Sequence, residues 1–255
     1  MKLTKLFIFI LVLFVSSNIW SAENNAFKDF QLAHQYYKNN QFKEAQTSYE
    51  QLLHRGYETS DLHYNLGNVY FRLNYIGLSI LQYEKALKLN PNNEDAAFNL
   101  KIANLKVVSK IKPMSDFILV KWYKKLIQWK SVRQWAYGQI LFAFIVLLSG
   151  ILFIFSSSSR FKKIAFYLGI FSISLNFLCC ILAWSAKKNI QSSDYGVITT
   201  PTYSLKSEPT DHAKDLILLH EGIKFMKVES IGKWYQIRLS DGNIGWVETS
   251  AIEMI

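Results

Sequence analysis

The chain has 255 residues, half of them hydrophobic, and a formal net charge of +10, a length that suits two small domains or one large one. The charge does not indicate nucleic-acid binding, because residues 26–107 carry nine cations and eight anions and residues 191–255 carry six cations and nine anions. The excess lies beside three apolar segments, whereas a nucleic-acid binder would present a basic face on a folded domain.

The first apolar segment, LFIFILVLFV from Leu6, follows two lysines near the N-terminus. Its ten residues are too few to span a bilayer but suit the apolar region of a secretory signal. Cleavage after Ala22 would leave Trp20 where a small residue is usual, so an uncleaved anchor is the alternative. We predict a signal peptide over residues 1–22.

Residues 26–107 contain an internal repeat with a period of 34 residues. The second copy reads LHYNLGNVYFRLNYIGLSILQYEKALKLNP, with small residues where two helices must approach closely and large residues between them. Asn74 to Gly77 is the predicted turn between the helices, and Pro91 ends the unit because proline cannot continue a helix. The aligned pairs are Leu32 and Leu66, Ala33 and Gly67, Tyr36 and Tyr70, Ala45 and Ser79, Tyr49 and Tyr83, and Leu52 and Ala86.

This pattern resembles the tetratricopeptide repeat, including its Leu-Gly-x-x-Tyr run, although His63 takes the place of the usual Trp. A third unit starts at Glu94 but has Lys101 and Asn104 at the small and Tyr positions, and no second helix follows with the pattern. A lone helix with a polar outer face suits the end of a solenoid. We therefore predict an all-α tetratricopeptide repeat solenoid over residues 26–107, with two repeats and a capping helix.

The resemblance implies that the first helix of each pair lines a concave groove for an extended peptide. Asn68 would fix the peptide backbone, and Lys38 or Arg72 would meet acidic groups. An equal alternative for Tyr64 and Phe71 is packing against the capping helix, because aromatic side chains often serve cores. The implied groove residues are Phe30, His34, Tyr37, Lys38, Tyr64, Asn68, Phe71 and Arg72.

Residues 114–133 interleave cations with aromatic residues, which suits a helix lying in the headgroup zone of a membrane. Apolar positions recur at helical spacing, and the lysines point largely the other way, toward lipid phosphates. The alternative is a set of ordinary flanking cations without a defined helix. Ser131 and Gln134 resemble a capping box that opens the next segment. The predicted membrane-surface residues, which would contact anionic lipid headgroups, are Lys121, Trp122, Lys124, Lys125 and Trp129.

Two charge-free segments, residues 135–155 and 164–184, have the length of transmembrane helices. They predict a two-helix transmembrane hairpin with residues 156–163 as a cytoplasmic loop, whose three cations agree with the positive-inside rule. The signal peptide places the N-terminus in the cytoplasm, so the regions on both sides of the hairpin would lie outside it. Asn176 is expected to pair with Ser149 or a backbone carbonyl of the hairpin, or to contact another membrane protein.

Residues 191–255 change to short alternating segments rich in β-forming residues, which predict an all-β domain. Asp241-Gly242 indicates a hairpin, because this pair suits a primed two-residue turn. The run GKWYQIRLSDGNIGWV resembles the bacterial SH3 domain, which implies a small SH3-like barrel and a binding module. The expected core tryptophans are Trp234 and Trp246, and the ligand-binding candidates are Tyr203 and Tyr235.

The order of signal peptide, repeat pair, basic aromatic segment, hairpin and SH3 domain resembles the BatE-type aerotolerance proteins. Such a multidomain membrane protein would be a scaffold in the bacterial inner membrane, with its repeat and SH3 domains on the periplasmic, extracytoplasmic side. The resemblance implies von Willebrand factor A-type membrane proteins and a MoxR-type ATPase as partners, and a link to aerotolerance or to oxidative or envelope stress. The alternative function is a cell-wall sensor that binds peptidoglycan through the SH3 domain.

Catalytic chemistry is not indicated by the sequence. It contains no Ser-His-Asp, Cys-His, paired-carboxylate or phosphate-loop arrangement, and its five histidines lack the spacing of metal ligands. We therefore expect a protein that is not an enzyme and that holds no cofactor or metal.

Overall fold

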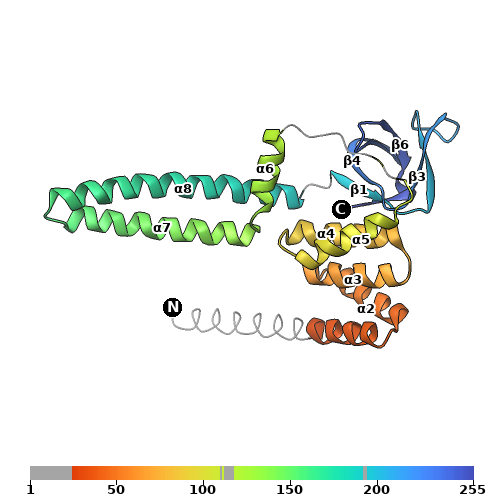
Figure 1. Cartoon of the computed structure of the whole chain (residues 1–255), viewed down its shortest axis with the longest axis horizontal. Helices are drawn as coiled ribbons and strands as arrows, with labels where there is room; N and C mark the ends of the chain where they lie inside the picture. The colour runs from red at the N-terminus through yellow and green to blue at the C-terminus, as the bar shows by residue number, and fades with distance from the viewer. Residues whose placement is uncertain (1–24, 110, 112–117, 192–193) are drawn as a thin grey trace, which may run out of the picture.

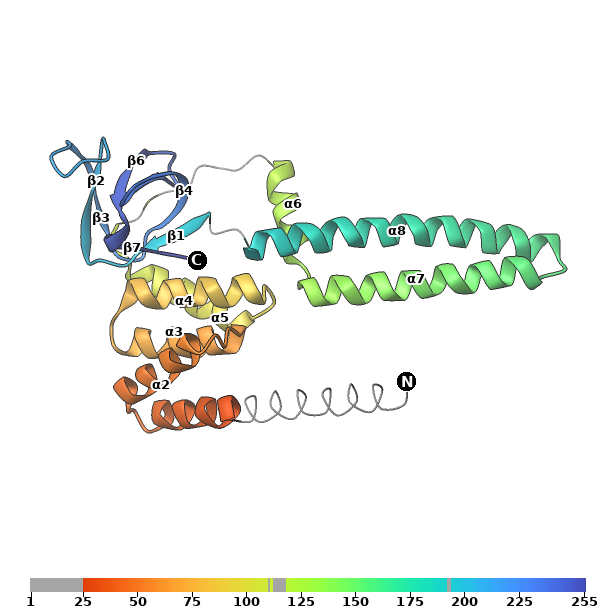
Figure 2. The same cartoon turned by 180° about the vertical axis from the view of Figure 1, so that it is seen from behind.

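A computed structural model of the chain describes residues 25–109, 111, 118–191 and 194–255. The predicted signal peptide lies outside the described residues, as does the start of the basic aromatic segment. A helical repeat, a long helical hairpin and a β-sheet follow one another along the chain (Figure 1). The repeat and the sheet, together called the head (residues 25–109 and 194–255), lie at one end of the hairpin (Figure 2).

The helical repeat consists of a helix over residues 25–38 and four further helices. Asn40 and Asn74 lie 34 positions apart, each at the turn inside a helix pair, and both are left-handed, with φ of 60° and 64°. Asparagine tolerates this conformation better than most residues, so the same turn recurs with the predicted period. The four helices are α2 (Phe42–His54), α3 (Ser60–Arg72), α4 (Ile76–Leu89) and α5 (Glu94–Lys106).

The aligned small and large residues pack as the repeat pattern predicts. A Cβ atom on Gly67 would lie 2.7 Å from the Tyr83 ring, so a larger residue there would force α3 away from α4. Ala33 is fully buried at the same position of the first copy. Leu32 is 44% exposed whereas its counterpart Leu66 is fully buried, because no earlier repeat covers the first helix within the described residues.

His63, at the position of the usual Trp, is buried, and its Nδ1 atom lies 2.6 Å from Oε1 of Gln82 on α4. Burial lowers the pKa of the imidazole. Lys85 acts in the same direction, whereas the Gln82 hydrogen bond and Glu58 oppose it. The folded protein therefore favours the neutral ring.

We expect the head to lose stability as pH falls below about 6.5, the ordinary histidine pKa. The unfolded chain binds a proton at His63 at a higher pH than the folded chain, so the stability is complete only above that pH. The measurement is the free energy of unfolding of the full chain at a series of pH values from roughly 8 to 5, and it should decrease in the lower part of this range. The variant His63→Phe should lose less stability over this pH range than the wild type. The variant His54→Phe, changed at an exposed site on α2, is the control and should behave as the wild type does. The same pH dependence in all three proteins would contradict the assignment.

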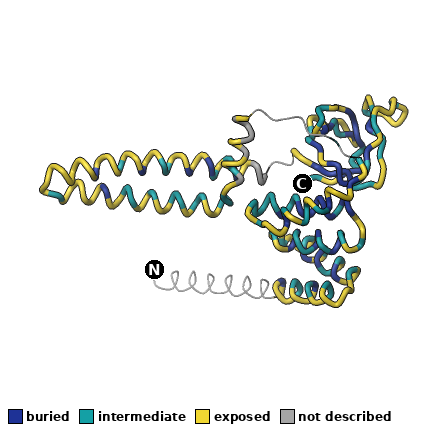
Figure 3. Tube along the Cα trace, viewed as in Figure 1, coloured by how far each residue is buried: buried dark blue, intermediate teal, exposed yellow. Residues whose placement is uncertain are grey.

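The hairpin is formed by α7 (Val132–Phe155) and α8 (Ser159–Gln191), which contain the two predicted spans. Both helices are long and apolar enough to cross a membrane. Ser131 and Gln134 form the predicted capping box at the start of α7. Most residues of the hairpin are exposed, whereas buried residues concentrate in the head (Figure 3). A bilayer would cover the apolar surface that the hairpin leaves open.

Inside the hairpin, small and polar residues face each other. A Cβ atom on Gly169 would lie 3.1 Å from Oγ of Ser149, so glycine permits the close approach of the two helices. Asn176 donates from Nδ2 to the backbone oxygen of Gln139 at 2.8 Å. Its amide is therefore satisfied by a backbone carbonyl of the hairpin, which is one of the predicted alternatives.

The C-terminal residues form one antiparallel seven-stranded sheet in the order β3-β2-β6-β5-β4-β1-β7. The sheet is open, so the closed barrel expected from the sequence is not formed. Strand β7 has three residues and pairs only with β1, and α4 covers apolar side chains at that edge. The strands are β1 (Tyr195–Ile198), β2 (Thr202–Lys206), β3 (Asp215–His220), β4 (Lys224–Ile231), β5 (Trp234–Leu239), β6 (Ile244–Glu248) and β7 (Ile252–Met254).

Asp241 and Gly242 connect β5 to β6 as predicted, but the prediction of a primed two-residue turn was wrong. Gly242 has a φ of 91°, whereas Asp241 does not adopt the positive φ that such a turn requires. The connection spans residues 240–243, and the Asp241 carboxylate accepts the backbone N–H of Asn243 at 3.0 Å. This side-chain hydrogen bond stabilises the longer turn.

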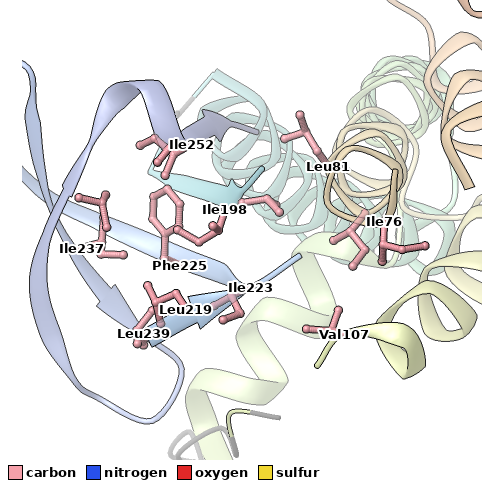
Figure 4. Close-up of a cluster of buried hydrophobic side chains, with 14 of the residues drawn as sticks. Ile76, Leu81, Val107, Ile198, Leu219, Ile223, Phe225, Ile237, Leu239 and Ile252 are labelled. Atoms are coloured by element: carbon pink, nitrogen blue, oxygen red, sulfur yellow. The ribbon is translucent and has the colours of Figure 1, made fainter. Parts of the chain in front are cut away.

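One hydrophobic core joins the helical repeat to the sheet, although the sequence predicted two separate domains. Ile76 and Leu81 of α4 and Val107, directly after α5, belong to the same buried cluster as Ile198 and Phe225 (Figure 4). Trp234 and Trp246 are buried in the sheet, as the sequence predicts. The repeat and the sheet therefore form one packed head.

Candidate functional site

The helical repeat contains a half-open pocket of about 130 Å³ between α3 and α5. Four of the eight groove residues implied by the sequence line it, and three further residues were missed. The lining residues are Tyr37, Asn68, Phe71, Arg72, Tyr83, Asn99 and Ile102.

Asn68 is fixed in this pocket by two hydrogen bonds. Its Oδ1 atom accepts from the Tyr83 hydroxyl and from Nδ2 of Asn99, each at 2.8 Å. Burial raises the pKa of Tyr83, so this hydroxyl stays protonated as a donor. Within the described residues the Asn68 Nδ2 group has no hydrogen-bond partner. A positioned amide donor in a pocket suits the carbonyl oxygen of an extended peptide.

Two cations stand over aromatic rings near the pocket. The Arg72 guanidinium lies 4.5 Å from the centre of the Phe42 ring, and the Lys106 ammonium lies 4.4 Å from the centre of the Phe71 ring. Cation–π contacts of this kind position a charge without neutralising it. No ion pair involves either cation within the described residues. The pocket therefore has a positive rim suited to an acidic group.

The other implied groove residues lie outside the pocket. Phe30 packs edge-on against Tyr49, with ring centres 5.6 Å apart, and Tyr64 packs against the shared core. His34 is half-buried, and its Nδ1 atom is buried without a hydrogen-bond partner in the described part of the chain. Lys38 is exposed at the end of the first helix.

The repeat period could have found part of what was missed. Ile102 and Lys106 lie 34 positions after Asn68 and Arg72, so the groove positions of α3 recur on α5. The sequence pattern predicts α5 only as a capping helix. Asn99 does not follow from this shift, and its role depends on the angle at which α5 crosses α3.

The two ligand candidates of the sheet are not neighbours in its strand order. Tyr203 lies on β2 and Tyr235 on β5, with β6 between them. The Tyr203 hydroxyl accepts the backbone N–H of Glu248 at 3.0 Å, and burial raises its pKa. Tyr235 is half-buried under the Lys227 ammonium, 4.0 Å from the ring centre. Tyr203 therefore holds strands together through its hydroxyl.

The basic aromatic segment forms α6 (Ile118–Gln128), which crosses α8 at the head end of the hairpin (Figure 1, Figure 2). Trp122 and Trp129 are 74% and 62% exposed, and Lys125 is exposed as well. The Tyr123 hydroxyl donates to Oγ of Ser185 on α8 at 3.3 Å. The side chains of Lys121 and Lys124 lie outside the description.

Comparison with known proteins identifies one part of this architecture. Residues 30–94 match the family described as tetratricopeptide repeat. This range runs from within the first helix to the first residue of α5, and it contains most of the residues that line the pocket. A search of the curated proteins finds no match to the chain. Tetratricopeptide repeats are typically interaction modules without catalytic residues, so protein partners are expected.

Proposed function

We propose that this protein is a non-enzymatic, membrane-anchored scaffold whose helical repeat binds an extended, acidic segment of a protein partner. The observation that carries the proposal is the pocket itself, where the Asn68 amide is positioned by two donors beside Arg72 and Lys106. The amide would hold a backbone carbonyl, and the two cations would attract carboxylates.

Asn68→Ala together with Arg72→Ala should reduce capture of the partner by about ten-fold or more, because it removes a hydrogen-bond donor and a charge. The measurement is crosslinking in native membranes followed by mass spectrometry. Asn104→Ala with Lys101→Ala, on the exposed face of α5, is the matched control and should capture the partner as the wild type does. An unchanged set of crosslinked proteins in the pocket variant would refute a groove function.

We further propose that the sheet is an SH3-like module. Its support is the antiparallel strand arrangement, the two buried tryptophans and positive-φ glycines at three of the turns. The order of segments resembles the BatE-type proteins, and this resemblance is the basis for proposing von Willebrand factor A-type proteins and a MoxR-type ATPase as partners in a bacterial envelope complex.

The hairpin and α6 support a membrane location for this scaffold. We propose that α7 and α8 span the bilayer, with α6 lying at its surface through the exposed Trp122 and through Trp129, which directly follows the helix. The shared core supports a topology in which the repeat and the sheet lie on the same side of the membrane. Following the expected signal peptide, that side is the extracytoplasmic one.

Protease added to intact spheroplasts should digest both the repeat and the sheet, because both are proposed to face outward. Alkaline phosphatase fused after Ile255 should be active, since the enzyme matures only outside the cytoplasm. A known external protein serves as the digestion control. Survival of either part, or an inactive fusion, would overturn this topology.

A further inference from the structure

The outer face of α4 differs from the same face of α2 in the first copy. Ile80 and Leu81 are almost completely buried. The residues 34 positions earlier, Gln46 and Thr47, are polar and lie at least partly in solvent. Apolar residues on the outside of a helix need a covering partner. That partner is the sheet, because Ile80 and Leu81 belong to one buried cluster with Ile198 of β1.

Glu221, at the turn before β4, caps the start of α4. The residue that precedes α4, Tyr75, makes no side-chain capping hydrogen bond. The Glu221 Oε2 atom accepts the backbone N–H of Gly77 at 2.7 Å. A carboxylate is favoured at this position by the unpaired N–H groups and by the helix dipole. A residue of the sheet therefore takes the place of the missing cap.

Two more polar contacts hold α4 to the sheet farther along its length. The Lys224 ammonium of β4 lies 2.7 Å from a carboxylate oxygen of Glu84. The Lys88 ammonium, in the last turn of α4, donates to the backbone oxygen of Ile255 at 2.8 Å. With Glu221, these contacts run from the first turn of the helix to the last.

Glycines allow the backbones to approach this closely. A Cβ atom on Gly77 would lie 3.0 Å from both the backbone oxygen of Ile198 and the Cβ atom of Glu221. Gly222 has a φ of 88°, and a Cβ atom there would lie 2.8 Å from side-chain atoms of Ile80 and Val107. A methyl group at either glycine would therefore force atoms of the contact between α4 and the sheet to shift.

The sheet lies where the helical repeat would otherwise continue. A second helix of a third unit would turn back after Val107 and cover α4 and α5. Instead Val107 is buried in the shared core, and Ser109 Oγ lies 2.6 Å from Nδ1 of His220 at the end of β3. The chain after α5 therefore runs onto the sheet.

We infer a further function for the sheet: it is the C-terminal cap of the helical repeat, and it holds α4 in the position that orders the groove. The link to the groove is Tyr83 of α4, which belongs to the core shared with the sheet and donates its hydroxyl hydrogen bond to Asn68. Loosening the contact between sheet and α4 thus loosens the pocket.

The variant Gly77→Ala, made in the full chain and reconstituted in nanodiscs, tests whether the sheet stabilises α4 as a cap or only lies beside it. Alanine in place of glycine normally stabilises a helix. Here the added methyl group meets the sheet backbone, so we expect a lower melting temperature of the head and faster amide exchange in α4 and at Asn68. Gly150→Ala, at a helical glycine with open space in α7, is the control and should leave the head unchanged.

Glu221→Gln tests the same contact without adding volume. Loss of the carboxylate charge should speed amide exchange in the first turn of α4 by about ten-fold. Glu229→Gln, on an exposed site of β4, should not. The inference fails if Gly77→Ala raises the melting temperature of the head, or if Glu221→Gln changes exchange in the sheet but not in α4.

Discussion

Replacing Tyr83 by alanine is expected to destabilise the head by about 3–5 kcal/mol, the usual cost of deleting a buried aromatic ring. The Tyr83 side chain is 1% exposed and fills the space that Gly67 leaves between α3 and α4. It also donates to Asn68 at the floor of the pocket. The change therefore removes packing and leaves the Asn68 carbonyl with one donor instead of two.

One further variant separates the contribution of the Tyr83 ring from that of its hydroxyl, and a second variant is a control at an exposed tyrosine. Tyr83→Phe keeps the packing and should cost about 1 kcal/mol, the net value of one hydrogen bond. Tyr75→Ala, at a 40% exposed tyrosine just before α4, should cost less than about 1 kcal/mol. Denaturant unfolding of the full chain, followed by pulse proteolysis of the repeat, measures all three. A cost for Tyr83→Ala no larger than that for Tyr75→Ala would show that Tyr83 is not part of a core.

The repeat was predictable because each unit uses the same solution to the same packing problem. The left-handed turns at Asn40 and Asn74 and the small residues at Ala33 and Gly67 all recur with the period. These features depend on residues close in the sequence, so a single sequence displays them. The capping box at Ser131 was predictable for the same reason.

The contact between repeat and sheet was not predicted, because it joins segments more than a hundred positions apart. Glu221 bonds to Gly77 across 144 positions, and nothing near either residue indicates the other. One feature of the local sequence does indicate a contact on α4: Ile80 and Leu81 are apolar where the first copy has polar residues. That contrast shows that the face is covered but does not identify what covers it.

The sequence predicts only the part of the pocket that follows from the repeat pattern. Residues on α3 follow from the repeat spacing, and two of them, Asn68 and Arg72, line the pocket. Asn99 and Lys106 come from α5, whose sequence departs from the repeat at the small and Tyr positions. The 34-residue shift leads from Arg72 to Lys106, whereas the place of Asn99 depends on how that helix packs, which the repeat pattern does not encode.

Phe225→Ala is the second substitution expected to have a large effect, and it should destabilise the head by about 3–5 kcal/mol. The ring is 2% exposed on β4 and packs over Gly196 of β1, where any Cβ atom would overlap it. Phe225 pairs with both Gly196 and Leu239 in the register of the sheet. Its removal leaves a cavity at the centre of the shared core, next to Ile198.

Because the cluster around Phe225 continues into α4, the loss should spread beyond the sheet. Hydrogen exchange of the full chain should become faster in α4 as well as in β1 and β4, although no residue of α4 has been changed. Leu218→Ala, at a 54% exposed leucine on β3, is the control and should leave both regions as they are. Faster exchange confined to the sheet would mean that the repeat and the sheet unfold independently, and the single core would then not be a cooperative unit.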